Sequence, residues 1–198
     1  MDDVDNRFPG DLVRTFKNVS WASFERRMAR KGESVVPRFT YLDRVLELVT
    51  PSRGHEKHKS WIGKLVAIWA LETGVQLSSF GSWTLTNKLK LAGAEPDDCY
   101  ILGDDSEEKL TRPHFVVEVQ WSRGGINKLE VYRRLGVREV WFWEKQKLAV
   151  YVLRGETWQR WKRSACLPDL DLDQLLTFLD RPAMTDAMRD YRAVLLGK

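Results

Sequence analysis

The spacing of apolar residues changes twice within residues 115–143. Residues 115–120 form a nearly continuous apolar run, which is typical of a buried strand. In residues 126–136 apolar side chains recur at every third position, as on one face of a helix that Asn127 would cap and Gly136 would end. Residues 137–143 return to β-branched and aromatic side chains. A strand, a helix and a second strand within about thirty residues predict a parallel crossover unit.

The remaining pattern predicts a scaffold of helices and short strands around this unit. Before it, we expect a helix at 20–30 stopped by Gly32, a hairpin at 38–49 and a long helix at 55–73 stopped by Gly74. A strand pair, or a bent strand interrupted by Gly81, should follow at 75–85, and a strand at 93–102. After it, we expect a hairpin at 148–161 and two helices, at 173–179 and 182–198. The alternation predicts an α/β fold in which helices flank a central mixed sheet.

Composition narrows the class of protein. A chain of 198 residues suits one domain, and 43% hydrophobic residues with nine tryptophans argue against disorder. The chain has only two cysteines, without metal-ligand spacing, which argues against a disulfide framework. No apolar stretch approaches eighteen residues and no charged-then-apolar leader is seen, so we expect a cytoplasmic enzyme without membrane partners.

Two acidic residues stand out against this background. Asp97 follows the turn-forming Pro96, and Glu118 lies inside the apolar run at 115–120. A charge in a strand core is costly unless it is paired or bound to a metal. Two carboxylates that converge from different segments are the ligands of a hard cation such as Mg²⁺. The alternative is a strand-end acid that pairs with an arginine.

The distribution of charge is compatible with a polyanionic substrate. Residues 91–118 carry eight acidic and two basic residues, whereas residues 119–163 carry four acidic and eleven basic ones. Residues 1–90 are also basic, with fifteen Lys and Arg against ten Asp and Glu. Acids could hold a cation while flanking basic residues hold phosphates. Surface charges that serve solubility alone would give the same totals.

Four blocks of the sequence together resemble a known family. Residues 95–100, 117–119, 124–129 and 132–143 look, in order and spacing, like the signature blocks of the Uma-type family of restriction endonucleases, within the PD-(D/E)XK nuclease superfamily. The similarity extends over about residues 19–178. The resemblance implies a restriction-endonuclease-like fold, with an N-terminal extension at 1–18, a nuclease-like domain at 19–180 and a C-terminal helical extension at 181–198.

The resemblance also implies roles at the metal site. Asp97 and Glu118 would be metal ligands, and the backbone carbonyl of Val119 would be a third. The lysine that the superfamily usually has two residues after the strand acid is replaced by Gln120. In the Uma-type branch this lysine is found on the following helix, which is Lys128 here. A solvated helix lysine is the alternative for that position.

The long helix at 55–73 begins with further polar residues. The resemblance points to Glu56 as an acid that completes the metal site through water. His55 and His58 do not form the two-histidine helical zinc motif, and at a helix start they are most often solvated or capping residues. In the later hairpin at 148–161 the aromatic side chains could stack on bases, although core or sheet-edge packing is the more frequent role of tryptophans at alternating strand positions.

The sequence thus favours a metal-dependent endonuclease, with Mg²⁺ or Mn²⁺ as the cofactor and DNA as the partner. A homodimer would allow symmetric cutting of both strands. Because Gln120 departs from the usual pattern, the alternative is a catalytically weak nuclease-fold module that binds nucleic acid or protein. A structural domain with an accidental ion-pair cluster would leave the ordered blocks unexplained.

Overall fold

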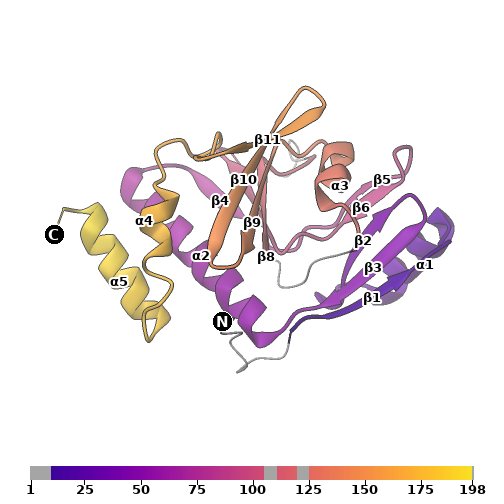
Figure 1. Cartoon of the computed structure of the whole chain (residues 1–198), viewed down its shortest axis with the longest axis horizontal. Coiled ribbons are helices and arrows are strands. Elements are labelled where there is room, and N and C mark those ends of the chain that lie inside the picture. The colour runs from indigo at the N-terminus through magenta and orange to yellow at the C-terminus, as the bar shows by residue number, and fades with distance from the viewer. Residues whose placement is uncertain (1–9, 105–110, 120–124, 198) are drawn as a thin grey trace.

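A computed structural model describes residues 10–104, 111–119 and 125–197 of the chain. Its strands form two sheets (Figure 1). The first has the order β1 (Leu12–Phe16), β3 (Val45–Thr50), β2 (Arg38–Leu42), β6 (Ala92–Ala94), β5 (Leu85–Asn87). The second has the order β11 (Thr157–Trp161), β10 (Lys147–Arg154), β9 (Glu139–Glu144), β8 (Phe115–Val119), β7 (Asp98–Leu102), β4 (Leu77–Ser79).

The second sheet is mixed and lies between helices. Strands β8 and β9 run parallel and the other described pairs of this sheet are antiparallel. The helices are α1 (Trp21–Lys31), α2 (Arg53–Thr73), α3 (Lys128–Leu135), α4 (Leu172–Leu176) and α5 (Met184–Leu195). Figure 1 shows α2, α4 and α5 on one side of this sheet and α3 on the other. The expected α/β, restriction-endonuclease-like fold is confirmed.

The two faces of the second sheet bury separate apolar clusters. Val117 and Val119 of β8 belong to the apolar cluster between the sheet and α2, called the α2 cluster. Val116 belongs to the cluster between the sheet and α3, called the α3 cluster, together with Val131 and Tyr132. This alternation follows from the period of two along a strand. Glu118 is two residues after Val116 on the same strand, so it also lies on the α3 face of the sheet.

Local signals placed most element ends correctly. Ser20 and Asn127 each accept a backbone N–H hydrogen bond at the start of their helices. Gly74 and Gly136 end α2 and α3 in the left-handed conformation, which glycine adopts without steric cost. The strand–helix–strand unit β8–α3–β9 is parallel as predicted. The hairpin turn at residues 43–44 has positive φ at both positions, as a type I′ turn requires.

Two strand predictions were wrong about sheet membership. The expected strand at 93–102 is two strands, β6 and β7, in different sheets, and the expected pair at 75–85 is likewise divided between β4 and β5. Pro96 has no N–H for a ladder hydrogen bond. Glu95 instead ends the first ladder, since its carboxylate accepts from the Phe39 N–H at 2.8 Å and from Lys31. The chain therefore passes from one sheet to the other immediately before Asp97.

The segments outside the expected core also take part in the structure. β1, within residues 1–18, pairs with β3 along five residues. The helix expected at 173–179 is the shorter α4, and α5 packs against α2. Within the described ranges, no helix is long and apolar enough to span a membrane.

Candidate active site

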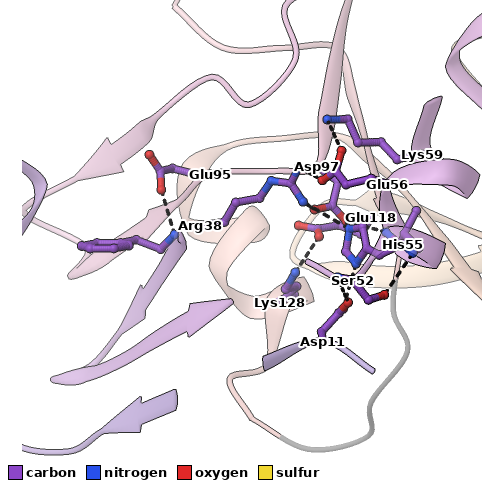
Figure 2. A network of polar contacts seen from close by, with 12 residues as sticks. Asp11, Arg38, Ser52, His55, Glu56, Lys59, Glu95, Asp97, Glu118 and Lys128 are labelled. Atoms are coloured by element: carbon purple, nitrogen blue, oxygen red, sulfur yellow. Dashed lines mark hydrogen bonds and ion pairs between the residues drawn. The ribbon is translucent and has the colours of Figure 1, made fainter. Parts of the chain in front are cut away.

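Asp97 and Glu118 come together where the two sheets meet. Asp97 lies one residue before β7, and the register of Asp98 with Val117 sets it opposite Glu118 on β8. Both side chains are almost fully buried, at 2% and 1% exposure. Burial, followed by the nearby Asp97 charge, raises the pKa of Glu118 despite the opposing effect of Lys128. Two interacting acids thus share a buried site, which Figure 2 shows with its neighbours.

Asp97 is held by three donors. Its Oδ1 accepts from the Arg38 guanidinium, and its Oδ2 lies 2.9 Å from His55 Nε2. The Val119 N–H donates to the same Oδ2 at 2.6 Å. Burial alone would raise the pKa of Asp97, but His55, Lys128 and Arg38 together hold it well below its usual value. Asp97 is therefore a carboxylate at neutral pH.

His55 connects this carboxylate to the N-terminal segment. It is 2% exposed, and its Nδ1 lies 2.8 Å from Asp11 Oδ2. Burial opposes its protonation, yet the two flanking carboxylates raise its pKa to about 9. The expectation of a solvated or merely capping histidine was wrong for His55. The charge arises from Asp11 and Asp97, which are distant in sequence.

Glu118 is held from α3. Its Oε2 lies 2.5 Å from Lys128 Nζ, and its Oε1 accepts from the Tyr132 hydroxyl. Lys128 stands in the first turn of α3; its side chain is 21% exposed, and its ammonium contacts the buried acid. The structure thus directs Lys128 toward the acid pair rather than into solvent alone.

Glu56 lies at the rim of this site. Its Oε1 is 2.6 Å from Arg38 Nη2 and its Oε2 is 3.3 Å from Lys59 Nζ. The side chain is 44% exposed and is linked to Asp97 through Arg38. Of the other expected residues, Val119 ends β8 with a buried side chain, and Gln120 lies outside the described residues.

Sequence reasoning missed Arg38, Asp11 and Tyr132 as members of the site. A buried arginine opening an apolar strand was a usable signal for Arg38, because such a charge requires a partner. The alternative of a strand acid paired with an arginine therefore applies in part to Asp97. Asp11 and Tyr132 gave no comparable local signal.

Glu47 was also missed, although it lies in an apolar run as Glu118 does. It is 5% exposed on β3, and its Oε2 accepts from the Ile126 N–H at 3.3 Å. At Gly125 the φ angle is +103°, and a Cβ added there would lie 2.0 Å from Glu47 Oε2. Glycine is therefore required where the chain enters α3. The Glu47 charge also helps to raise the pKa of Lys128.

The donor atoms at this site fit a hard divalent cation. No three His, Cys, Asp or Glu side chains among the described residues are grouped as a metal centre. A carboxylate offers about four lone-pair positions. The contacts above occupy three on Asp97 and two on Glu118, which leaves acceptor capacity on both. Oxygen donors of this kind suit Mg²⁺ or Mn²⁺.

The fold and the buried acid pair define a restriction-endonuclease-like protein. The model of the Uma2 family, described as "Putative restriction endonuclease", matches residues 21–181. The match covers most of the chain, so the protein belongs to this family. A comparison with curated proteins returned no match. Restriction-endonuclease-like families generally use divalent metals.

Proposed function

We propose that this protein is a metal-dependent endonuclease that hydrolyses phosphodiester bonds in DNA, with Mg²⁺ as its cofactor and Mn²⁺ as a substitute. The proposal depends chiefly on one observation: the buried carboxylates of Asp97 and Glu118 lie side by side with the Lys128 ammonium 2.5 Å from Glu118. Phosphodiester hydrolysis uses carboxylates to hold a metal ion and a cation to stabilise the charge on the phosphoryl group, and this site combines the two.

Asp97, Glu118 and the backbone carbonyl of Val119 would hold the metal ion. When bound, a divalent cation supplies a water of lowered pKa and polarises the phosphoryl oxygen. Arg38 and His55 keep Asp97 ionised and fix its orientation through their contacts. Glu56, at the rim, would act on the site through water.

Lys128 is suited to electrostatic stabilisation rather than to proton abstraction. Burial lowers its pKa, but Glu118 and Asp97 outweigh that effect and raise the pKa above the ordinary lysine value. An ammonium that keeps its proton cannot act as a general base at neutral pH. It can stabilise negative charge that develops on a phosphate under attack.

The charge distribution supports a nucleic acid as the substrate. The basic segments at 1–90 and 119–163 flank the acidic segment that contains Asp97 and Glu118. If these basic residues contact phosphates, DNA affinity should fall steeply as the salt concentration rises. Symmetric cleavage of both strands would additionally require two copies of the site, as in a homodimer.

The second candidate function is a nuclease-fold module that binds nucleic acid or protein without efficient cleavage. One observation favours it: Arg38 and His55 already supply positive charge to Asp97, and Lys128 supplies it to Glu118. The acid pair is therefore compensated without a metal. Gln120, in place of the usual lysine, favours the same alternative.

A cleavage assay combined with metal titration separates the two functions. Supercoiled, linear duplex and single-stranded DNA would be incubated with the full chain and Mg²⁺ or Mn²⁺, using Asp97→Asn as the inactive control. An endonuclease cuts at least one form in a metal-dependent manner, and Asp97→Asn loses both cleavage and calorimetric Mn²⁺ binding. DNA binding without cleavage under every condition would favour the binding module.

A further inference from the structure

A cavity of about 290 Å³ adjoins the candidate active site on the α3 face of the second sheet. Lys128 belongs to its wall as well as to the acid pair's surroundings. The opposite wall comes from β9 and β10, which contribute Phe142, Glu144 and Tyr151. Phe142 stands next to Glu118 in the register of β9 and β8, so the cavity begins directly beside the proposed reaction centre.

The inner wall of the cavity is aromatic. The rings of Phe142 and Tyr151 lie 5.8 Å apart at an interplanar angle of 78°, which is an edge-to-face contact. Phe142 is 7% exposed and anchors this pair in the α3 cluster, while Tyr151 is partly exposed. A partly exposed aromatic ring on a rigid sheet is a platform on which a nucleobase can stack.

The charged residues around the cavity indicate how a nucleotide would be oriented in it. Lys128 lies at one side, and Glu144, exposed at the end of β9, lies at the rim. A phosphate is attracted by Lys128 and repelled by Glu144. The Glu144 carboxylate makes no ion pair within the described ranges and can accept hydrogen bonds from a base amino group, as acids do with cytosine N4. A nucleotide would therefore enter with its phosphate at Lys128 and its base toward Glu144.

Arg160 supplies a second positive charge near the cavity, in addition to Lys128. Arg160 of β11 stands opposite Tyr151 in the strand register, is exposed, and makes no ion pair in the part of the chain that the structure describes. Neighbouring residues in register project from the same face of a sheet. Arg160 is thus available to the phosphate on the other side of the stacked base.

We propose that this cavity binds one unstacked nucleobase, bearing an exocyclic amino group, from the nucleotide next to the bond that is cut. The base stacks on Tyr151, its amino group donates to Glu144, and Lys128 and Arg160 contact the flanking phosphates. The assignment rests on the proposed nuclease function and adds a preference for adenine, cytosine or guanine over thymine at one position. It also requires that the base leave the helical stack.

The test uses single-stranded oligonucleotides with 2-aminopurine placed at successive positions and a dye at one end. The full chain would be mixed with them in EDTA, so that binding is measured without cleavage. We expect the 2-aminopurine fluorescence to change on binding at a restricted position. Tyr151→Ala should remove that change and weaken binding by about tenfold or more, the effect expected for loss of one base–aromatic stack. Trp161→Ala is the matched control, because Trp161 projects from the opposite face of the same sheet edge.

Base preference supplies the second readout. Oligonucleotides with adenine, cytosine or thymine at the identified position would be compared, and wild type should bind thymine roughly tenfold more weakly. In Glu144→Gln this difference should shrink several-fold, because an amide can donate to thymine O4 as well as accept.

The outcomes distinguish this assignment from the proposed function. Metal-dependent cleavage with a Tyr151→Ala variant that binds and reports like wild type would overturn the base site and leave the nuclease function standing. An absence of DNA binding by wild type would overturn the base site, and only if no DNA form is cleaved with Mg²⁺ or Mn²⁺ either would the proposed function fall with it. Loss of the local fluorescence signal in Tyr151→Ala alone, with the Trp161→Ala variant unchanged, would support the site.

Discussion

Glu118 and Glu139 are both 1% exposed carboxylates on neighbouring strands of one sheet, yet their surroundings differ in kind. Glu139 accepts from neutral donors of fixed position: the Trp141 indole, the Ser164 hydroxyl and the N–H groups of Ala165 and Cys166. The donors from residues 164–166 lie on the segment that leads toward α4. Glu139 therefore fastens that segment to the sheet.

Glu118 instead faces a second acid and a cation that is partly exposed. Burial and Asp97 raise its pKa, whereas Lys128 and Tyr132 act in the opposite direction. A site that places like charges together inside the protein does so at a cost in stability, which is typical of functional sites. The comparison shows that burial of a strand acid does not by itself indicate function. The nature of its partners does.

The largest expected effect comes from Glu118→Gln. Turnover should fall by roughly 10³-fold, because one ligand of the proposed cation is lost. Stability in metal-free buffer should change little, since loss of the ion pair with Lys128 is offset by removal of a charge that burial and Asp97 disfavour. Single-turnover cleavage and urea unfolding measure the two quantities, and salt-dependent DNA binding should persist. A variant that loses folding stability along with activity would place Glu118 with the structural acids.

The second prediction concerns the charged cluster around Asp97. The pKa of His55 is about 9 in the folded protein and near 6.5 when unfolded, so the protonated form stabilises the fold. This contribution is fully present below about pH 6.5 and is lost as the pH rises through 9. Urea unfolding in EDTA should show a decrease of roughly 3 kcal/mol over that range. His55→Gln should flatten this pH dependence; an unchanged slope would mean that another group is responsible.

Lys128→Ala tests the cation that distinguishes Glu118 from Glu139. Turnover should fall by roughly 10²-fold, as for loss of one electrostatic group. Adding Gln120→Lys in the same background should recover part of the rate, because it returns an ammonium to the position usual in the superfamily. Cleavage kinetics at saturating metal provide the measurement. Normal cleavage by Lys128→Ala would exclude this lysine from the mechanism.

The smallest effect is expected for Glu139→Gln. The amide would turn an N–H₂ donor toward hydroxyl or N–H donors that now contact a carboxylate, which should lower the unfolding free energy by about 1–3 kcal/mol. Turnover per folded molecule should stay within a few-fold of wild type. Thermal unfolding and the cleavage assay together provide the check. A 10²-fold loss of turnover would remove the distinction between the two acids.

Much of the fold followed from local rules that hold within a few residues. The cap at Asn127 and the stop at Gly136 bounded α3 correctly, and the change of period around it predicted the parallel unit that carries Glu118. The division into two sheets was missed because a strand's partner is not encoded in its own period. The pairing of β6 with β2 and of β7 with β8 reveals that the chain changes sheet there, and the contacts of Glu95 with β2 mark the point.

Residue order and type were enough to identify the acid pair, to connect Lys128 with it and to indicate the family. These features lie in contiguous blocks whose spacing carries the signal. The ionic partners of Asp97 required the assembled molecule, because Arg38 is 59 positions away and His55 is brought in on α2. Charges interact through space, and more strongly in the low-dielectric interior than in water. Protonation at this site therefore depends on neighbours that no local sequence pattern specifies.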